Sequence, residues 1–178
     1  MARASAEPRT ARLFLALSPP PAVRAALAAH VQAWRWPAEA RRYAPEDWHL
    51  TLHFLGAVPR ERIEALCAGL AVPVVPFTLR LGLPLRWPQG LAVLLPDESP
   101  PLLRLHEQLG QAVRALGLST DVRPYRPHVT LARHAAAAEP PAQAAVFDWP
   151  VRGYALVEST GEAARRYRIV QAYGAVPA

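Results

Sequence analysis

A four-residue pattern that occurs twice constrains the fold of this chain more than any other feature of its sequence. Residues 49–52 read His-Leu-Thr-Leu, and residues 128–131 read His-Val-Thr-Leu. Successive side chains of a β-strand point to opposite faces, so each histidine shares a face with the threonine two positions later. The apolar residues of each pattern occupy the other face. The sequence therefore predicts two half-buried strands that each present an imidazole and a hydroxyl on one side.

The second pattern begins 79 residues after the first, and the same offset relates other parts of the chain. It moves the apolar run 12–17 onto the apolar run 91–96, and it brings the proline-rich break at 19–21 close to residues 99–101. Each half thus contains a strand, a proline break, a helix and a His-x-Thr strand in the same order. An internal repeat of this kind indicates that the chain is built twice on one plan.

Hydrophobic periodicity predicts the remaining elements. Three stretches show apolar residues at helical spacing: 23–34, 59–70 and 102–116. Three further runs are typical of strands: 77–81, 154–158 and 167–170. The Ala/Pro-rich stretch 134–145 is predicted to be a loop. This mixture predicts an α+β fold with a largely antiparallel sheet, in a single domain over residues 1–178 that begins with a flexible tail at 1–11.

Composition narrows the classes of function. All 20 basic residues are arginine, and the net charge of +6 favours an anionic partner such as RNA or a nucleotide. The planar arginine fork binds phosphate with fixed geometry, and the lack of lysine excludes mechanisms that need a covalent lysine. No apolar run approaches the ~20 residues of a membrane span. The single cysteine, Cys67, forbids an intrachain disulfide, so we expect a cytoplasmic protein without a membrane partner.

Two imidazoles on facing strands suit acid–base chemistry on a phosphate ester. Imidazole titrates near neutrality, so His49 and His128 can divide the work, one donating a proton while the other accepts one. Each such transfer is typically worth ~10²–10⁴ in rate. Phosphodiester cleavage needs both transfers, because water loses a proton while the leaving oxygen gains one. The hydroxyls of Thr51 and Thr130 can donate to the non-bridging oxygens, where negative charge develops.

The sequence around the two patterns resembles that of a known family. Residues 45–56, Pro-Glu-Asp-Trp-His-Leu-Thr-Leu-His-Phe-Leu-Gly, and residues 126–133, Arg-Pro-His-Val-Thr-Leu-Ala-Arg, are similar to the two signatures of the 2H phosphoesterase superfamily. Within it the chain most resembles the RNA 2′,3′-cyclic phosphodiesterases, also called 2′-5′ RNA ligases. The similarity extends to the run 12–17, the segment 76–81 and the strands between 154 and 173.

The resemblance implies two lobes related by a pseudo-two-fold axis, each an antiparallel-rich sheet with helices outside, and a central cleft between them. It implies hydrolysis of a terminal 2′,3′-cyclic phosphate to a 2′-phosphate, with no metal ion or other cofactor. By this resemblance His49 is the proton donor to the departing O3′ and His128 is the proton acceptor that activates water, although either can take the other role in the reverse direction. Thr51 and Thr130 would hold the phosphate.

An arginine follows the second signature in this family, and it corresponds to Arg133. The resemblance implies that Arg133 binds the phosphate. Strict alternation from His128, however, puts Arg133 on the opposite face of the strand. The side chain reaches the cleft only if the strand bulges or ends near Ala132.

Three other residues are candidates for contacts to RNA. His53, where relatives often carry lysine, would share the strand face of His49 about 13 Å further along, and we expect it to contact the RNA backbone. Tyr125 and Arg126 lead directly into the second pattern. Aromatic side chains in such places can stack on bases.

Other functions remain open from the residues alone. The i,i+4 spacing of His49 and His53 suits a zinc hydrolase if this segment is helical. A non-catalytic protein that binds RNA ends or nucleotides would need the cleft and the arginines but not both imidazoles. The same fold could act on a small cyclic nucleotide, or join RNA ends through a 2′-5′ linkage in the reverse reaction. The partner we expect is RNA with a 2′,3′-cyclic phosphate end, or tRNA fragments, bound by a monomer.

Overall fold

The computed structural model describes residues 9–162 and 165–175. Its helices and strands follow one another as β1 (Thr10–Leu17), α1 (Pro21–Gln32), β2 (Arg41–Arg42), β3 (Leu50–Pro59), α2 (Ile63–Gly69), β4 (Phe77–Trp87), β5 (Leu91–Pro96), α3 (Pro100–Ala115), β6 (Val129–Arg133), β7 (Phe147–Val151), β8 (Gly153–Ser159) and β9 (Tyr167–Gly174). Two short 3₁₀ helices, η1 (Pro45–Asp47) and η2 (Arg60–Arg62), precede β3 and α2.

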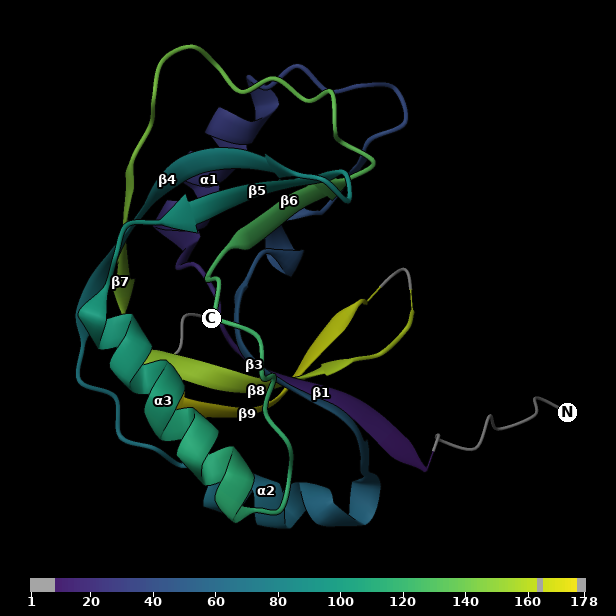
Figure 1. Ribbon diagram of the computed structural model, residues 1–178, viewed down its shortest axis with the longest axis vertical. Coiled ribbons are helices and arrows are strands. Elements are labelled where there is room, and N and C mark those ends of the chain that lie inside the picture. Colours follow the sequence, from purple (N-terminus) through teal and green to yellow (C-terminus); the bar gives the residue numbers. More distant parts are fainter. Residues whose placement is uncertain (1–8, 163–164, 176–178) are drawn as a thin grey trace, which may run out of the picture.

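The strands form one antiparallel sheet that is divided near its middle. Their order is β7-β4-β5-β6-β3-β1-β8-β9, with the short β2 paired to β6. Among the described residues, β3 and β6 are joined at one pair, Leu50 and Val129. The half-sheet around β4, β5 and β6 forms the upper lobe in Figure 1, and the half-sheet around β1, β8 and β9 forms the lower lobe.

The offset of 79 residues is visible in the three-dimensional structure. β1 corresponds to β5, α1 to α3, and β3 to β6. Pro21 is the first residue of α1 and Pro100 is the first residue of α3, 79 positions later. Proline suits this position because the first N–H of a helix has no partner within the helix. The predicted α+β fold with two pseudo-symmetric lobes is confirmed.

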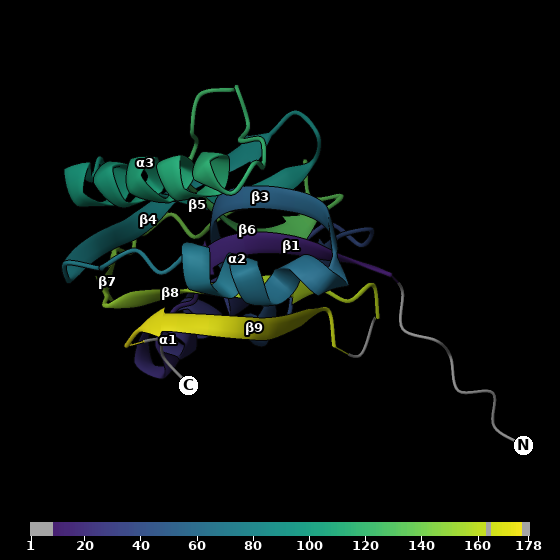
Figure 2. The ribbon, with the colours of Figure 1, turned by 90° about the horizontal axis from the view of Figure 1, so that it is seen from below.

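The helices cover the outer sides of the half-sheets and tie the lobes together. α1 buries Val23, Leu27 and Val31, and α3 buries a longer apolar face made by Leu102, Leu105, Leu109 and Val113. α1 lies against β7, whereas α3 lies against β3 (Figure 2). α1, from the first half of the chain, therefore packs on the half-sheet that contains β6. α3, from the second half of the chain, packs on the half-sheet that contains β3. No described helix is long and apolar enough to cross a membrane.

Several boundaries differ from those expected. β1 begins at Thr10, and Ala11 is 2% exposed, so the last residues of the expected tail belong to the sheet. Residues 1–8 of that tail lie outside the described residues. β4 continues to Trp87, beyond the predicted end at 81, because it pairs with both β5 and β7. β7 itself was not predicted, since its sequence contains Pro150, which is unfavourable in most strands.

Candidate active site

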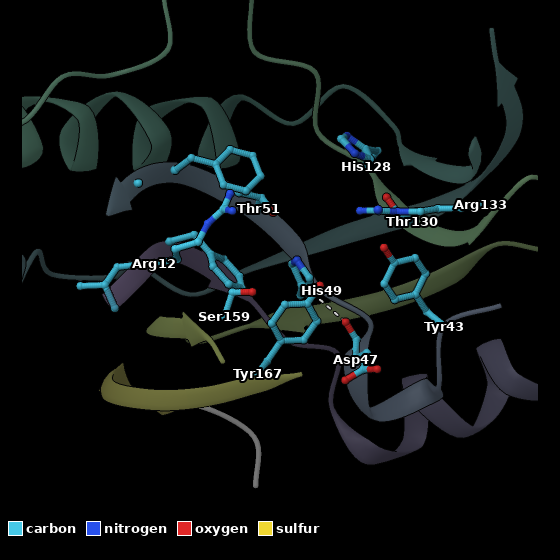
Figure 3. A pocket seen from close by; sticks show the side chains of 14 residues that line it. Arg12, Tyr43, Asp47, His49, Thr51, His128, Thr130, Arg133, Ser159 and Tyr167 are labelled. Carbon is cyan, nitrogen blue, oxygen red and sulfur yellow. Dashed lines mark hydrogen bonds between the residues drawn. The ribbon is translucent and has the colours of Figure 1, made fainter. Parts of the chain in front are cut away.

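A cavity of about 350 Å³ is lined by residues of both lobes (Figure 3). Five of the eight predicted site residues line it: His49, Thr51, His128, Thr130 and Arg133. His49 immediately precedes β3, and Thr51 lies in β3. His128 immediately precedes β6, and Thr130 and Arg133 lie in β6. The strands that carry the repeated pattern thus bring both imidazoles to one space.

The two histidines are oriented by the same backbone device. His49 Nδ1 lies 2.7 Å from the carbonyl oxygen of Asp47, and His128 Nδ1 lies 2.7 Å from the carbonyl oxygen of Arg126. A carbonyl can only accept, so each Nδ1 carries the proton that it donates. The Nε2 atom of each ring is left for the cavity, where it can accept a proton when the ring is neutral and donate one when the ring is charged.

Aromatic rings pack against the site histidines and shield them in part from solvent. The ring centres of Phe14 and Tyr167 lie 5.0 Å and 4.9 Å from that of His49, and the Trp87 ring lies 4.5 Å from that of His128. Burial lowers the pKa of both imidazoles from the ordinary value of 6.5. The charge of His128 lowers the pKa of His49 further, so the two rings are close enough to influence each other's protonation.

A β-bulge in β6 turns Arg133 into the cavity. Thr130 and Ala132 pair with two adjacent residues of β5, so Leu131 is an extra residue on β6. A bulge shifts the alternation of the residues beyond it. Arg133 therefore lies on the same side as Thr130 and lines the cavity (Figure 3). The strand ends there, because His134 adopts a positive φ of 51°.

An equivalent bulge in β3 has the opposite consequence for His53. Thr51 and His53 pair with adjacent residues of β1, so Leu52 is the extra residue, 79 positions before its counterpart in β6. His53 is thereby turned away from the cavity. Phe54, which is 65% exposed, lines the cavity at the place that corresponds to Arg133 in the other lobe.

The prediction that His53 contacts RNA is wrong, because the bulge buries this side chain against α3. His53 is 6% exposed, its Nε2 lies 2.7 Å from the carbonyl oxygen of His106, and the two rings stack with centres 4.1 Å apart. His49 and His53 therefore cannot ligate one zinc ion. Among the described residues, no group of three or more His, Cys, Asp or Glu side chains is arranged to hold a metal ion.

Tyr125 is engaged within the protein and is not placed to stack on a base. Its ring stacks on His106 with centres 3.8 Å apart, and its hydroxyl donates to the carbonyl oxygen of Thr51 at 3.1 Å. Burial raises its pKa. His106, to which the sequence assigned no role, is the middle ring of a stack of His53, His106 and Tyr125. Burial, followed by the charge of His53, lowers the pKa of His106 to about 4.

Arg126 remains a candidate contact to RNA. The Arg126 side chain is exposed, and its guanidinium carbon lies 4.6 Å from the centre of the Trp87 ring. That ring also packs on His128. Arg126 thus lies at the rim of the site with its charge available to an anion.

Sequence reasoning missed several residues of the cavity wall. Arg12 and Ser159 are register partners in β1 and β8, and both line the cavity. Tyr167 also lines it. Tyr43 was not missed, because an aromatic residue so near the first pattern is a candidate for stacking on a base; it lines the cavity, and Figure 3 shows its hydroxyl directed inward. Arg12 and Ser159 are distant in the sequence, so only the pairing of β1 with β8 could have revealed them.

Fold and site together define a two-lobed phosphoesterase with a pair of histidines in its cleft. A family model described as the 2′-5′ RNA ligase superfamily matches residues 19–162. The RNA 2′,3′-cyclic phosphodiesterase of Escherichia coli (strain K12) is 36% identical over 157 residues, which cover 84% of each chain. The enzyme of the same name from Thermus thermophilus is 37% identical over 172 residues, covering 83% of this chain and 81% of its own. The chain belongs to the 2′-5′ RNA ligase superfamily.

Solved structures agree with this assignment. The apo form of E. coli LigT matches with a TM-score of 0.76 and 25% identity, covering 94% of this chain and 98% of that one. The Thermus thermophilus protein TT0787 matches with a TM-score of 0.74 and 32% identity, covering 92% and 97%. LigT has also been solved in complex with 3′-AMP, at a TM-score of 0.74 and 26% identity.

Proposed function

We propose that this protein hydrolyses the 2′,3′-cyclic phosphate at the end of an RNA to a 2′-phosphate, with His49 and His128 as the acid and base. One observation carries the proposal. Matching 2.7 Å hydrogen bonds hold both imidazoles so that each Nε2 is left for a cavity that also contains two hydroxyls and a guanidinium. Relatives that are 36% and 37% identical bear the name RNA 2′,3′-cyclic phosphodiesterase, which supports the choice of substrate.

The residues two positions before the two histidines differ in charge. Asp47 and Arg126, whose carbonyl oxygens orient the rings, occupy equivalent positions 79 residues apart. The positive charge of Arg126 lowers the pKa of His128, which favours the neutral ring that a base requires. The position beside His49 carries a carboxylate instead of a cation. The charge of His128 in turn lowers the pKa of His49, so these charges favour neither division of the roles. We assign His49 as the acid and His128 as the base from the similarity of the two signatures to those of the family.

In this scheme His128 Nε2 takes a proton from water while the oxygen of that water attacks phosphorus. The bond to O3′ breaks, and His49 Nε2 supplies the proton that O3′ needs. Negative charge increases on the non-bridging oxygens as the bond to water forms. The Thr51 and Thr130 hydroxyls and the Arg133 guanidinium stabilise that charge. Solvent then exchanges the protons and restores the starting state of both rings.

The direct test offers a short RNA that ends in a 2′,3′-cyclic phosphate to the protein in the presence of EDTA. We expect a 2′-phosphate product, identified by phosphorus NMR. A product with a 3′-phosphate would contradict the proposed leaving group. Loss of turnover in EDTA that added metal restores would contradict a mechanism carried by the two histidines alone.

Replacement of either histidine is expected to stop the reaction while the cavity still binds phosphate. His49→Ala and His128→Ala should each lower kcat by about 10²–10⁴, because each removes one proton transfer. His30→Ala serves as the control, since His30 lies on α1 outside the cavity. Rates are measured on the RNA substrate, and product affinity by calorimetry. Unchanged turnover in either site variant would leave only a binding role.

The setting of the reaction follows from the same proposal. We propose that residues 1–178 work as one bilobal domain and as a monomer in the cytoplasm, on cyclic phosphate ends such as those of tRNA fragments. The single cysteine, which cannot form an intrachain disulfide, supports the location. The same site can join RNA ends when the 5′-hydroxyl of a second RNA takes the place of water as the nucleophile: it attacks phosphorus, the bond to O3′ breaks, O3′ takes the proton from His49, and a 2′-5′ linkage results. Sedimentation tests whether the protein is a monomer. An assay with a 5′-hydroxyl RNA tests whether the site joins RNA ends.

A further inference from the structure

Arginine crowds the edge of the cavity around Arg133. Arg41 of β2 is the direct register partner of Arg133 in β6. Directly opposed residues of antiparallel strands share a face of the sheet, and like charges in such a pair are destabilising. Because Arg133 lines the cavity, Arg41 extends the same charged face outward from it. Such a pair gains stability when an anion lies across it.

A third guanidinium reaches this edge from another part of the chain. Arg166, next to the start of β9, has its guanidinium carbon 5.0 Å from the centre of the Tyr43 ring. The guanidinium carbon of Arg133 lies 5.7 Å from the same ring. Tyr43 follows Arg41 by two residues and lines the cavity. Three separate segments therefore bring Arg41, Arg133 and Arg166 to one place.

Negative charge at this edge is insufficient to balance the arginines. Within residues 9–162 and 165–175, Asp47 is paired with Arg166 at 3.7 Å, and neither Arg41 nor Arg133 has an ion pair. The Arg166 side chain is 48% exposed, and an exposed pair at this distance is weak. Arg133 can bind the reacting phosphate. Arg41 and Arg166 then remain available to bind a second anion.

We propose that Arg41 and Arg166 bind the phosphodiester that precedes the terminal cyclic phosphate. This inference rests on the proposed function and specifies its substrate. With the reacting phosphate at Arg133, the preceding phosphate lies across Arg41 and Arg166 as the RNA leaves the cavity along β2. The preferred substrate is an RNA of two or more nucleotides, and a cyclic mononucleotide lacks the group that these arginines recognise.

The test compares two dinucleotides that both end in a 2′,3′-cyclic phosphate and differ in one linkage. One has a normal phosphodiester between its nucleotides, and the other has an uncharged methylphosphonate, tested as each stereoisomer. We expect kcat/KM of the wild-type protein to be about 10–100-fold lower for the neutral linkage, the range expected for lost charge-assisted hydrogen bonds. Arg41→Gln and Arg166→Gln should each reduce this ratio, and the double variant should bring it close to one.

Arg104→Gln provides the matched control, because Arg104 is an exposed arginine on α3 that does not line the cavity. This variant should keep the wild-type ratio. Equal kcat/KM for both dinucleotides in the wild-type protein would overturn the inference and leave the proposed function standing. A ratio that is lost in Arg12→Gln but kept in the double variant would overturn it too, since the RNA would then leave at the other end of the cavity. Hydrolysis of neither dinucleotide would overturn the proposed function itself.

Discussion

At the scale of single residues, burial controls the protonation of the two site histidines more than any neighbouring charge does. Desolvation is the largest cause that lowers the pKa of His49 and of His128. The hydrogen bond from each Nδ1 to a carbonyl oxygen opposes this effect without outweighing it. A proton on His128 also makes a proton on His49 less favourable. The pair therefore takes up its protons in separate steps, as one acid and one base require.

The lowered pKa values of His49 and His128 predict that catalytic activity is highest at acidic pH. A plot of kcat/KM against pH reports the pKa values of the free enzyme, and both are lowered from 6.5. Activity falls at low pH as the base becomes protonated, and it falls at high pH as the acid loses its proton. We expect a bell-shaped profile with its maximum below pH 6.5, measured from initial rates at low substrate concentration. The kcat profile should lie at higher pH, because bound phosphate stabilises an imidazolium. A kcat/KM maximum above neutrality would contradict this account.

At the scale of single elements, the two bulges decide which side chains serve the site. The repeated pattern, the proline breaks before α1 and α3, and the order of most elements were readable from local sequence, whereas β2 and β7 were not. The extra residues Leu52 and Leu131 were not, because a bulge is a property of pairing with a neighbouring strand. The same device that turns Arg133 into the cavity turns His53 away from it. Residue type alone could not distinguish these two cases.

The stack of His53, His106 and Tyr125 leads to a prediction about stability. His53→Ala removes a buried ring and its hydrogen bond to His106, so we expect the free energy of unfolding to fall by about 1–3 kcal/mol. KM for RNA should change little, because this side chain lies behind the site. Urea unfolding and steady-state rates measure the two quantities. A large rise in KM with unchanged stability would restore the RNA contact that the sequence suggested.

At the scale of the whole molecule, the stability of the fold is especially sensitive to substitutions at the junction between the half-sheets. Leu50 and Val129 form the pair that joins β3 to β6, and both are fully buried. Leu50→Ala would leave a cavity next to His49, and we expect the free energy of unfolding to fall by about 2–5 kcal/mol. Urea unfolding provides the measurement. Leu103→Ala on α3, where the side chain is 49% exposed, should change stability by only about 0.5 kcal/mol. Equal effects of the two substitutions would contradict this role of the junction.

The order of strands also bears on how such a chain can arise. β4 follows the first His-x-Thr strand along the chain, yet it pairs with β5 in the lobe of the second. β8 follows the second His-x-Thr strand and pairs with β1 in the lobe of the first. Two copies of an ancestor of half the length would have had to exchange their last strands, so that the last strand of each copy paired with the sheet of the other. Gene duplication and fusion would then have made an exchanged dimer permanent, with one histidine inherited from each parent.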